Sequence, residues 1–188
     1  MIILLGIVLA VVAVVVLAAI YLIVAYNGLV RLRNAVQEAW AQIDVQLKRR
    51  YDLIPNLVET VKGYASHEKE TFERVIKARQ AGIDASSIED QAAAENMITG
   101  ALRRIFALSE AYPELKANQN FLALQEELSS TENKIGFARQ YYNDQVRGMN
   151  TRVEMFPTNI IAGMFGFKRM SFFELEDGAA REAPKVSF

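Results

Sequence analysis

Side chains that could carry out acid-base or metal chemistry are sparse in this sequence and are not grouped. The chain has one histidine, His67, and no cysteine, which excludes disulfides, thiolate zinc sites, cysteine nucleophiles and a histidine-rich metal site. Two carboxylate pairs stand close together, Glu126 with Glu127 and Glu174 with Glu176. Neither pair has a histidine or a further ligand beside it, so we interpret both as solvated helix faces rather than general acids and bases.

Enzyme motifs are absent from the sequence as well. There is no glycine-rich phosphate loop, no G-x-S-x-G turn and no metal-ligand spacing. His67 lies in Ser66-His67-Glu68 after Gly63 and is interpreted as a surface turn or helix-start residue. The sequence therefore predicts a protein that is not an enzyme, with no catalytic residue, no metal and no cofactor.

The overall charge is close to neutral, with 21 Lys and Arg against 22 Asp and Glu. A nucleic-acid partner would favour a basic face, so none is expected. The short basic run Lys48-Arg49-Arg50 falls in a helical pattern and is interpreted as a solvated face; contact with anionic lipid or with a partner is the alternative.

The first thirty residues carry no charged side chain, and within Met1–Ala25 the only polar group is the Tyr21 hydroxyl. About 20 helical residues suffice to cross a hydrocarbon core of roughly 30 Å. We therefore predict a membrane anchor over residues 1–28, spanning Met1 to Tyr26, with Tyr21 and Tyr26 at its interfacial end. A cleaved signal peptide would carry a basic residue before its apolar run, and a buried helix would need a wider domain around it.

The charges that flank this span predict its orientation. Five cations follow it within about 20 residues: Arg31, Arg33, Lys48, Arg49 and Arg50. The positive-inside rule places the domain after the span in the cytoplasm and a short N-terminus outside.

An amphipathic stripe continues directly from the span. Apolar residues recur at spacings of three and four, at Leu32, Val36, Trp40, Ile43, Leu47, Tyr51, Ile54, Val58 and Val61. No turn signal separates this stripe from the span, which predicts one nearly continuous helix leaving the bilayer. The stripe keeps its phase across Pro55, which favours a kink over a break. Pro55 and the turn at Gly63 are the candidate hinges.

Further helices are predicted along the rest of the chain. Residues 66–80 read as a helix, Gly82 to Ser87 as a turn, and Ser87 with Asp90 as the cap of the next helix. The longest pattern after the anchor runs from Phe121 to Phe156 in near-heptad spacing. Its asparagines either bond across packed helices or face water. The fold class is therefore all-α, with an antiparallel helical bundle over residues 29–157.

Residues 158–176 form an apolar, phenylalanine-rich segment. We predict that the phenylalanines of this segment pack on the bundle or on another copy: Phe165, Phe167, Phe172 and Phe173. Contact with the bilayer surface is the alternative, because Lys168 and Arg169 could bind lipid headgroups. Residues 177–188 are polar and expected to be loose.

Three blocks of this sequence resemble the LemA family of bacterial membrane proteins. They are Arg49-Arg50-Tyr51-Asp52-Leu53-Ile54-Pro55-Asn56-Leu57-Val58, Tyr112-Pro113-Glu114-Leu115-Lys116-Ala117-Asn118, and Phe156-Pro157 with Asn159-Ile160-Ile161-Ala162. One departure is Gly148-Met149-Asn150, where an aromatic residue is expected before the asparagine. The resemblance implies a single span in the bacterial cytoplasmic membrane, a long antiparallel bundle, and no catalytic residue or cofactor.

Three functions compete at this point. The first is a membrane-anchored helical scaffold that self-associates into a homo-oligomer and organises or supports the membrane. The second is a signalling or adaptor module that recruits a soluble partner through hinges at Pro55 and Gly63. The third is a lipid-binding, membrane-remodelling protein.

Overall fold

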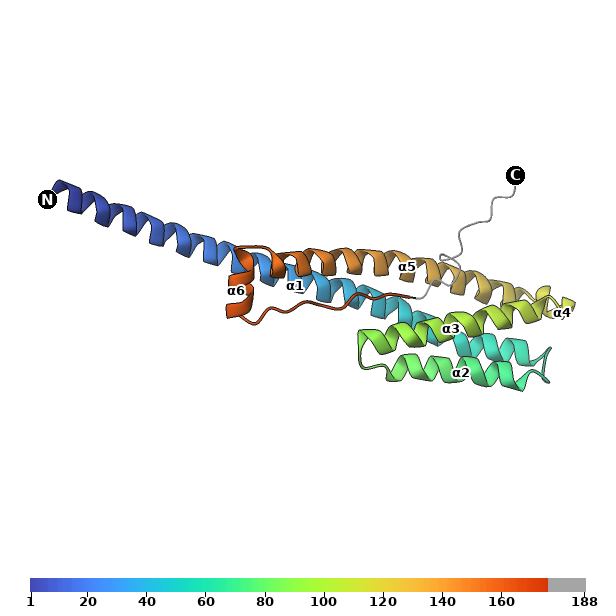
Figure 1. Ribbon diagram of the computed structural model, residues 1–188. Helices are drawn as coiled ribbons and strands as arrows, with labels where there is room; N and C mark the ends of the chain where they lie inside the picture. Colours follow the sequence, from blue (N-terminus) through green and yellow to red (C-terminus); the bar gives the residue numbers. More distant parts are fainter. Residues whose placement is uncertain (176–188) are drawn as a thin grey trace, which may run out of the picture. The chain divides into compact units, whose positions relative to one another are not determined.

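The computed structural model describes residues 1–175 of the chain and is all-α over that range. Its helices are α1 (Ile2–Lys62), α2 (Lys69–Asp84), α3 (Ile88–Ser109), α4 (Pro113–Lys116), α5 (Gln119–Glu154) and α6 (Thr158–Met164), as Figure 1 shows. The predicted fold class, a long N-terminal apolar helix that leads into a helical bundle, is confirmed. The predicted loose tail, residues 177–188, lies outside the described residues.

The chain divides into two compact units. We call Met1–Ala41 with Tyr141–Met170 the anchor unit, and Gln42–Gln140 with the described residues from Ser171 to Leu175 the bundle unit. The division of the chain into anchor, bundle, phenylalanine-rich segment and tail remains a prediction.

Helix α1 is continuous over 61 residues, as the unbroken apolar pattern predicted. Its most apolar 18-residue window has a mean hydropathy of 3.4, and no residue of that window is buried. A buried helix of a soluble domain is thereby excluded within this structure, and the length and composition are sufficient to cross a membrane.

Pro55 lies inside α1 without interrupting it, and the helix ends just before Gly63. A proline cannot donate a hydrogen bond to the carbonyl four residues earlier, which here belongs to Tyr51. The Arg79 Nε group of α2 donates to that carbonyl at 2.8 Å instead. The Tyr51 carbonyl, which has no donor within α1, thus fastens α1 to α2 through Arg79. Movement at Pro55 or Gly63 remains a prediction.

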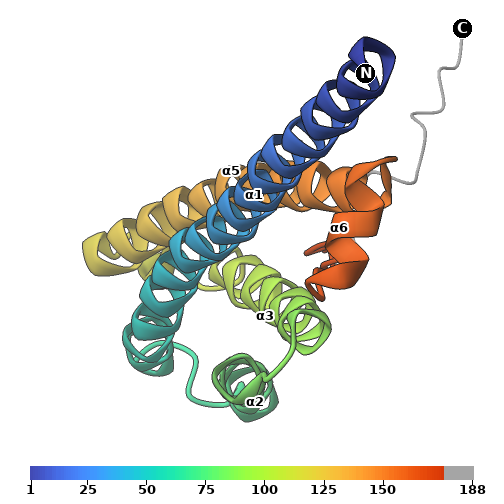
Figure 2. The same cartoon turned by 90° about the vertical axis from the view of Figure 1, so that its left-hand side faces the viewer.

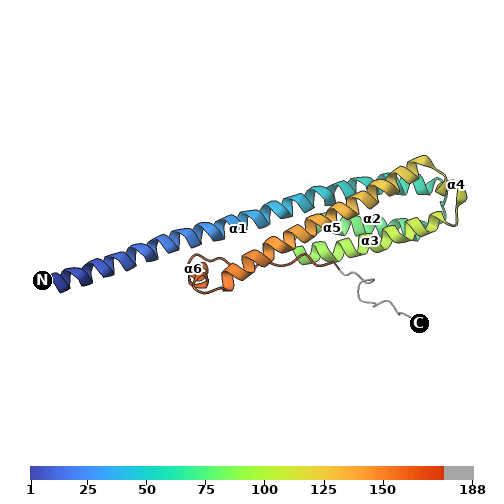
Figure 3. The same ribbon diagram turned by 90° about the horizontal axis from the view of Figure 1, so that it is seen from above.

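The bundle unit contains the short helix α4 and four longer helical segments that alternate in direction: the end of α1, α2, α3 and the first part of α5 (Figures 1 and 3). Figure 2 shows α2 and α3 side by side. Helix α3 begins as predicted, because the Ser87 Oγ accepts from the Asp90 backbone N–H at 3.0 Å. Helix α5 has a similar cap, since the Asn118 Oδ1 accepts from the Phe121 N–H at 2.9 Å.

The predicted turn after α2 begins later than expected. Helix α2 runs to Asp84, so that Gly82 is a buried helical residue. A Cβ atom at Gly82 would lie 2.5 Å from the Tyr51 hydroxyl. Glycine is needed here for close approach of α1 and α2 rather than for a turn.

The anchor unit packs the part of α1 up to Ala41 against the end of α5 and against α6. Trp40 and Tyr142 stack edge-on with ring centroids 5.4 Å apart. Helix α6 follows a cis Phe156–Pro157 bond and runs across α1 rather than along it (Figures 1 and 3). The chain then turns back along α5, where Asn150 accepts from the Met170 N–H at 2.8 Å and donates to its carbonyl at 3.0 Å.

Candidate functional site

The interfacial end of the anchor helix is covered by α6 and by the turn that follows it. The hydroxyls of Tyr21 and Thr158 are hydrogen-bonded at 3.1 Å. The Tyr26 ring packs against Phe165 and Phe167, with centroids 4.7 and 5.8 Å away. The structure therefore brings both predicted interfacial tyrosines together with the phenylalanine-rich segment, while their depth in a bilayer remains a prediction.

The four phenylalanines of that segment differ in exposure. Phe167 and Phe173 are buried within the protein, Phe172 is partly exposed, and Phe165 is half exposed. The Arg33 guanidinium lies 5.4 Å from the Phe167 ring centre, a cation–π contact. Contact with another copy or with lipid remains a prediction for these residues, and Phe165 is the one whose side chain offers the largest exposed fraction.

An apolar surface surrounds α6. Thr158, Ile161 and Ala162 point into the anchor unit and are buried. Five apolar side chains at the end of α5, on α6 and just after it are at least half exposed: Met155, Phe156, Ile160, Met164 and Phe165. Sequence reasoning missed Met155, and it assigned Phe156 to the packed stripe of the long helix. Exposed apolar groups gathered in this way mark a contact surface for a membrane or a protein.

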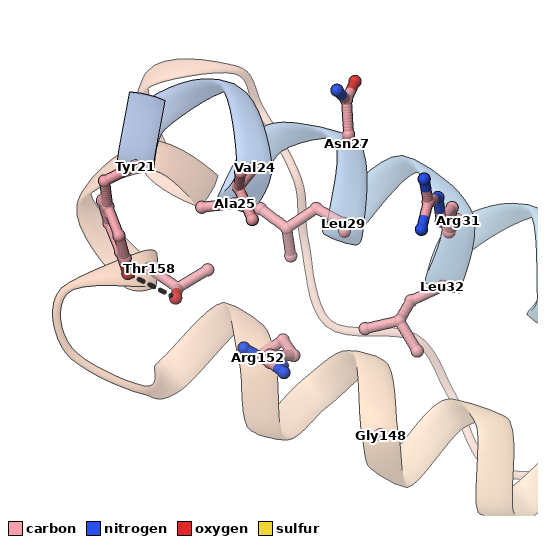
Figure 4. A pocket seen from close by; sticks show the side chains of 11 residues that line it. Tyr21, Val24, Ala25, Asn27, Leu29, Arg31, Leu32, Gly148, Arg152 and Thr158 are labelled. Atoms are coloured by element: carbon pink, nitrogen blue, oxygen red, sulfur yellow. Dashed lines mark hydrogen bonds between the residues drawn. The ribbon is translucent and has the colours of Figure 1, made fainter. Parts of the chain in front are cut away.

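A pocket of about 480 Å³ opens between α1, the end of α5 and α6 (Figure 4). Its apolar lining comes from Val24, Ala25, Leu29 and Leu32. Its polar lining comes from Tyr21, Asn27, Arg31, Arg152 and Thr158, and the glycines Gly28 and Gly148 complete the wall. Both Arg31 and Arg152 are exposed, and neither has an ion-pair partner within residues 1–175.

The anchor unit carries a surplus of positive charge. It contains six Lys and Arg residues against three Asp and Glu, a net side-chain charge of +3, while the rest of the chain carries −4. Two of the six cations are neutralised locally, by the ion pairs Arg147–Asp144 and Arg169–Glu154. The remaining positive charge includes the two arginines of the pocket.

The bundle unit holds a second polar cluster, and this one is buried. The Arg50 guanidinium donates to Glu95 at 3.0 Å and to Thr99 at 3.0 Å, and the Tyr51 hydroxyl also donates to Glu95. Gln91 donates to the Tyr51 hydroxyl at 2.6 Å. Only 2% of the Arg50 side chain and 0% of the Glu95 side chain are exposed. The interpretation of Lys48-Arg49-Arg50 as a solvated face is therefore wrong for Arg50, because its side chain turns inward to a carboxylate on α3.

Burial determines the protonation behaviour of this cluster. Desolvation raises the pKa of the Glu95 carboxyl, and the Arg50 charge beside it opposes the rise. Burial and the neighbouring Glu95 raise the pKa of the Tyr51 hydroxyl, so Tyr51 stays protonated and acts as a donor. The cluster holds α1 to α3 and gives no sign of catalytic chemistry. Sequence reasoning missed Glu95 and Gln91, whose only signal is their i, i+4 spacing on an otherwise apolar helix face.

An all-α protein with an exposed membrane-spanning helix and a positively charged anchor unit is a membrane-associated protein. The model of the LemA family matches residues 39–188, so the chain belongs to the LemA family. The described part of the matched region includes Arg50 and Tyr51, whose hydrogen bonds fasten α1 to α3 and α2.

Curated relatives are similar over most of the chain. Protein LemA of Metamycoplasma hominis is 27% identical over 80% of this chain and 69% of its own length. Magnetosome protein MamQ 2 of Paramagnetospirillum magneticum is 25% identical over 81% of this chain and 66% of its own length. Magnetosome protein MamQ of Magnetospirillum gryphiswaldense is 24% identical over 81% and 65%. The chain thus spans about two thirds of the length of each relative.

Proposed function

We propose that this protein is a membrane-anchored, non-catalytic helical scaffold that self-associates and organises or supports the bacterial membrane in which it is anchored. The observation that carries the proposal is the course of α1, whose bare apolar half continues without a break into the helix that the bundle unit is built on. Such a helix ties the bundle unit to the bilayer with no flexible linker between them.

A second contact with the bilayer supports the anchoring role. Helix α6 runs across α1 close to Tyr21 and Tyr26, so that it lies along the membrane surface when α1 crosses the membrane (Figure 1). Its outward side chains Ile160 and Met164 are apolar, as in helices that rest at a membrane interface, although Asn159 is exposed as well. The net charge of +3 on the anchor unit supports placing the flank of the span, and the bundle unit with it, on the cytoplasmic side.

Self-association is supported by apolar side chains that the single chain leaves uncovered on the bundle unit. Val45 on α1 is 64% exposed and Phe137 on α5 is 75% exposed. A second copy is the simplest cover for such residues, because identical surfaces can close into a symmetric oligomer.

The test is the mass of the full-length protein in mild detergent, measured by light scattering and electron microscopy. We expect a discrete particle of many copies that shrinks when Phe137 is replaced by serine. The matched control is Lys134→Ser, at an exposed polar position of the same helix, which should leave the mass unchanged. A wild-type monomer would contradict the scaffold proposal and favour the adaptor function.

A further inference from the structure

The pocket between α1, α5 and α6 begins where the apolar run of the anchor helix gives way to polar side chains. Tyr21 carries the first hydroxyl after that run, and about 20 helical residues are enough to cross a hydrocarbon core of roughly 30 Å. The lining residues on α1 then continue from Tyr21 to Leu32, roughly 17 Å further along the helix. The pocket therefore begins at the edge of the hydrocarbon core and extends through the headgroup layer.

The chemistry of the pocket changes along the same direction. Val24 and Ala25 line it near the hydrocarbon edge, together with the hydrogen-bonded hydroxyls of Tyr21 and Thr158 (Figure 4). Arg31 contributes a guanidinium about 9 Å further along α1 than Ala25, and Arg152 contributes a second one from α5. Along α1 the lining thus passes from the hydroxyl pair through apolar side chains to Arg31, so the hydroxyl groups lie on the hydrocarbon side and a cation lies on the far side. A phospholipid likewise presents its acyl chains and ester groups on the hydrocarbon side of its phosphate.

The two arginines are available for an external anion. Three other cations of the anchor unit are engaged, Arg147 with Asp144, Arg169 with Glu154, and Arg33 with the Phe167 ring, and Lys168 does not line the pocket. Within the described residues, Arg31 and Arg152 have no such partner. A guanidinium binds phosphate through two parallel hydrogen bonds, so two guanidiniums in one pocket suit a phosphate group.

We propose that this pocket binds the headgroup of an anionic phospholipid, with Arg31 and Arg152 supplying the positive charge for the phosphate and the acyl chains along the exposed surface of α1. The apolar lining and the position at the membrane edge favour a lipid over free phosphate. A pocket volume of about 480 Å³ is in the range of small-ligand sites and exceeds what a phosphate alone would fill. The proposal depends on the membrane anchor and is independent of self-association.

The test measures lipids bound per protomer by native mass spectrometry of the full-length protein in mild detergent. The probes are dioleoylphosphatidylglycerol, dioleoylphosphatidylcholine and inorganic phosphate. We expect a single phosphatidylglycerol to bind at least tenfold more tightly than phosphatidylcholine. Arg31→Gln and Arg152→Gln should each weaken phosphatidylglycerol binding about tenfold, the loss expected for one charge-assisted pair of hydrogen bonds.

Two further variants separate a specific pocket from general surface charge. Arg147→Gln removes a cation of the same helix that is already ion-paired, and it should leave lipid binding unchanged. Gly28→Leu adds a side chain in the pocket wall, where a Cβ meets no atom within 4 Å. It should abolish binding while both arginines remain.

Three outcomes would overturn the proposal. The first is equal loss of lipid binding in Arg147→Gln and Arg152→Gln, which would indicate attraction by net charge alone. The second is unchanged binding in Gly28→Leu, which would place the lipid elsewhere. The third is displacement of the lipid by millimolar inorganic phosphate, which would identify a free-anion site. A wild-type monomer in the mass measurement would contradict the scaffold and leave the lipid counts unaffected, so the two proposals fail separately.

Discussion

One arginine of the bundle unit, Arg50, and two of the anchor unit, Arg31 and Arg152, differ in burial and in their partners. In the bundle unit, Arg50 is buried and held by Glu95 and Thr99 from one neighbouring helix. In the anchor unit, Arg31 and Arg152 are exposed in an open pocket without a carboxylate partner among residues 1–175. A buried charge must be neutralised inside the protein, whereas an exposed charge is stabilised by water and can bind an external partner. The comparison separates arginines that hold the fold from arginines that are free to bind.

Apolar side chains show a parallel contrast. The bundle unit places Ile43, Ile54, Ile98 and Ile105 in its core with no exposed surface. The anchor unit leaves Phe156, Ile160 and Met164 more than half exposed around α6. The buried isoleucines therefore stabilise the fold, whereas the exposed residues around α6 form a contact surface. Substitutions of the buried residues should affect unfolding, and substitutions of the exposed residues around α6 should affect binding and local order.

The largest effect is expected for Arg50→Met. This change leaves Glu95 buried without its cation, and breaking a buried ion pair in this way costs about 3–5 kcal/mol of unfolding free energy. The control is the neighbouring residue, Arg49→Met. Its ion pair with Glu127 is about half exposed, so the change should cost less than about 1 kcal/mol. Denaturant unfolding of the full-length protein in detergent measures both. Equal losses would show that burial of the pair is not what matters.

The same variant should respond to pH in a defined direction. Arg50 opposes the rise in the Glu95 pKa that burial causes, so its removal raises that pKa further. The folded variant then keeps the Glu95 proton at a pH where the unfolded chain, with an ordinary glutamate pKa of about 4.3, has lost it. The contribution of Glu95 to the unfolding free energy is fully present below the unfolded pKa and is lost as the pH rises through the raised folded pKa. The deficit of Arg50→Met relative to wild type should be small near pH 4 and should grow toward pH 7. A deficit independent of pH would assign the loss to another group.

A smaller effect tests how Pro55 fastens α1 to α2. Arg79→Met removes the donor to the Tyr51 carbonyl, and an unsatisfied carbonyl costs about 1–3 kcal/mol. In a Pro55→Ala background the alanine N–H can take over that carbonyl, so the same Arg79→Met change should cost less there. A double-mutant cycle in unfolding free energy measures this coupling. Additive losses would mean that the Arg79 bond does not depend on the proline.

How far the sequence predicts this structure depends on how local each signal is. The uncharged run before Arg31 predicts a long apolar helix, the Ser87–Asp90 pair predicts the start of α3, and the structure has both. The inward turn of Arg50 was not predictable, because its partner lies 45 residues away on another helix. From the local sequence, Gly82 suggests a turn. In the structure it is a helical residue whose missing side chain leaves room for the Tyr51 ring, and that contact cannot be predicted from neighbouring residues. The pocket was missed for the same reason, since Arg152 and Thr158 meet α1 only after the chain has folded back.

The smallest change in global stability is expected in the anchor unit, for Asn150→Ala. Asn150 pairs with both backbone groups of Met170 and so fixes the segment after α6 to α5. Met170 is only partly buried, so water can replace the lost bonds and the unfolding free energy should change by about 1 kcal/mol or less. Hydrogen exchange of residues 165–170 should nevertheless become much faster, because the segment opens locally without unfolding the bundle. Asn133→Ala, at an exposed asparagine of the same helix, should leave exchange unchanged. A loss of global stability as large as that of Arg50→Met would show that the anchor unit, too, bears on unfolding of the whole chain.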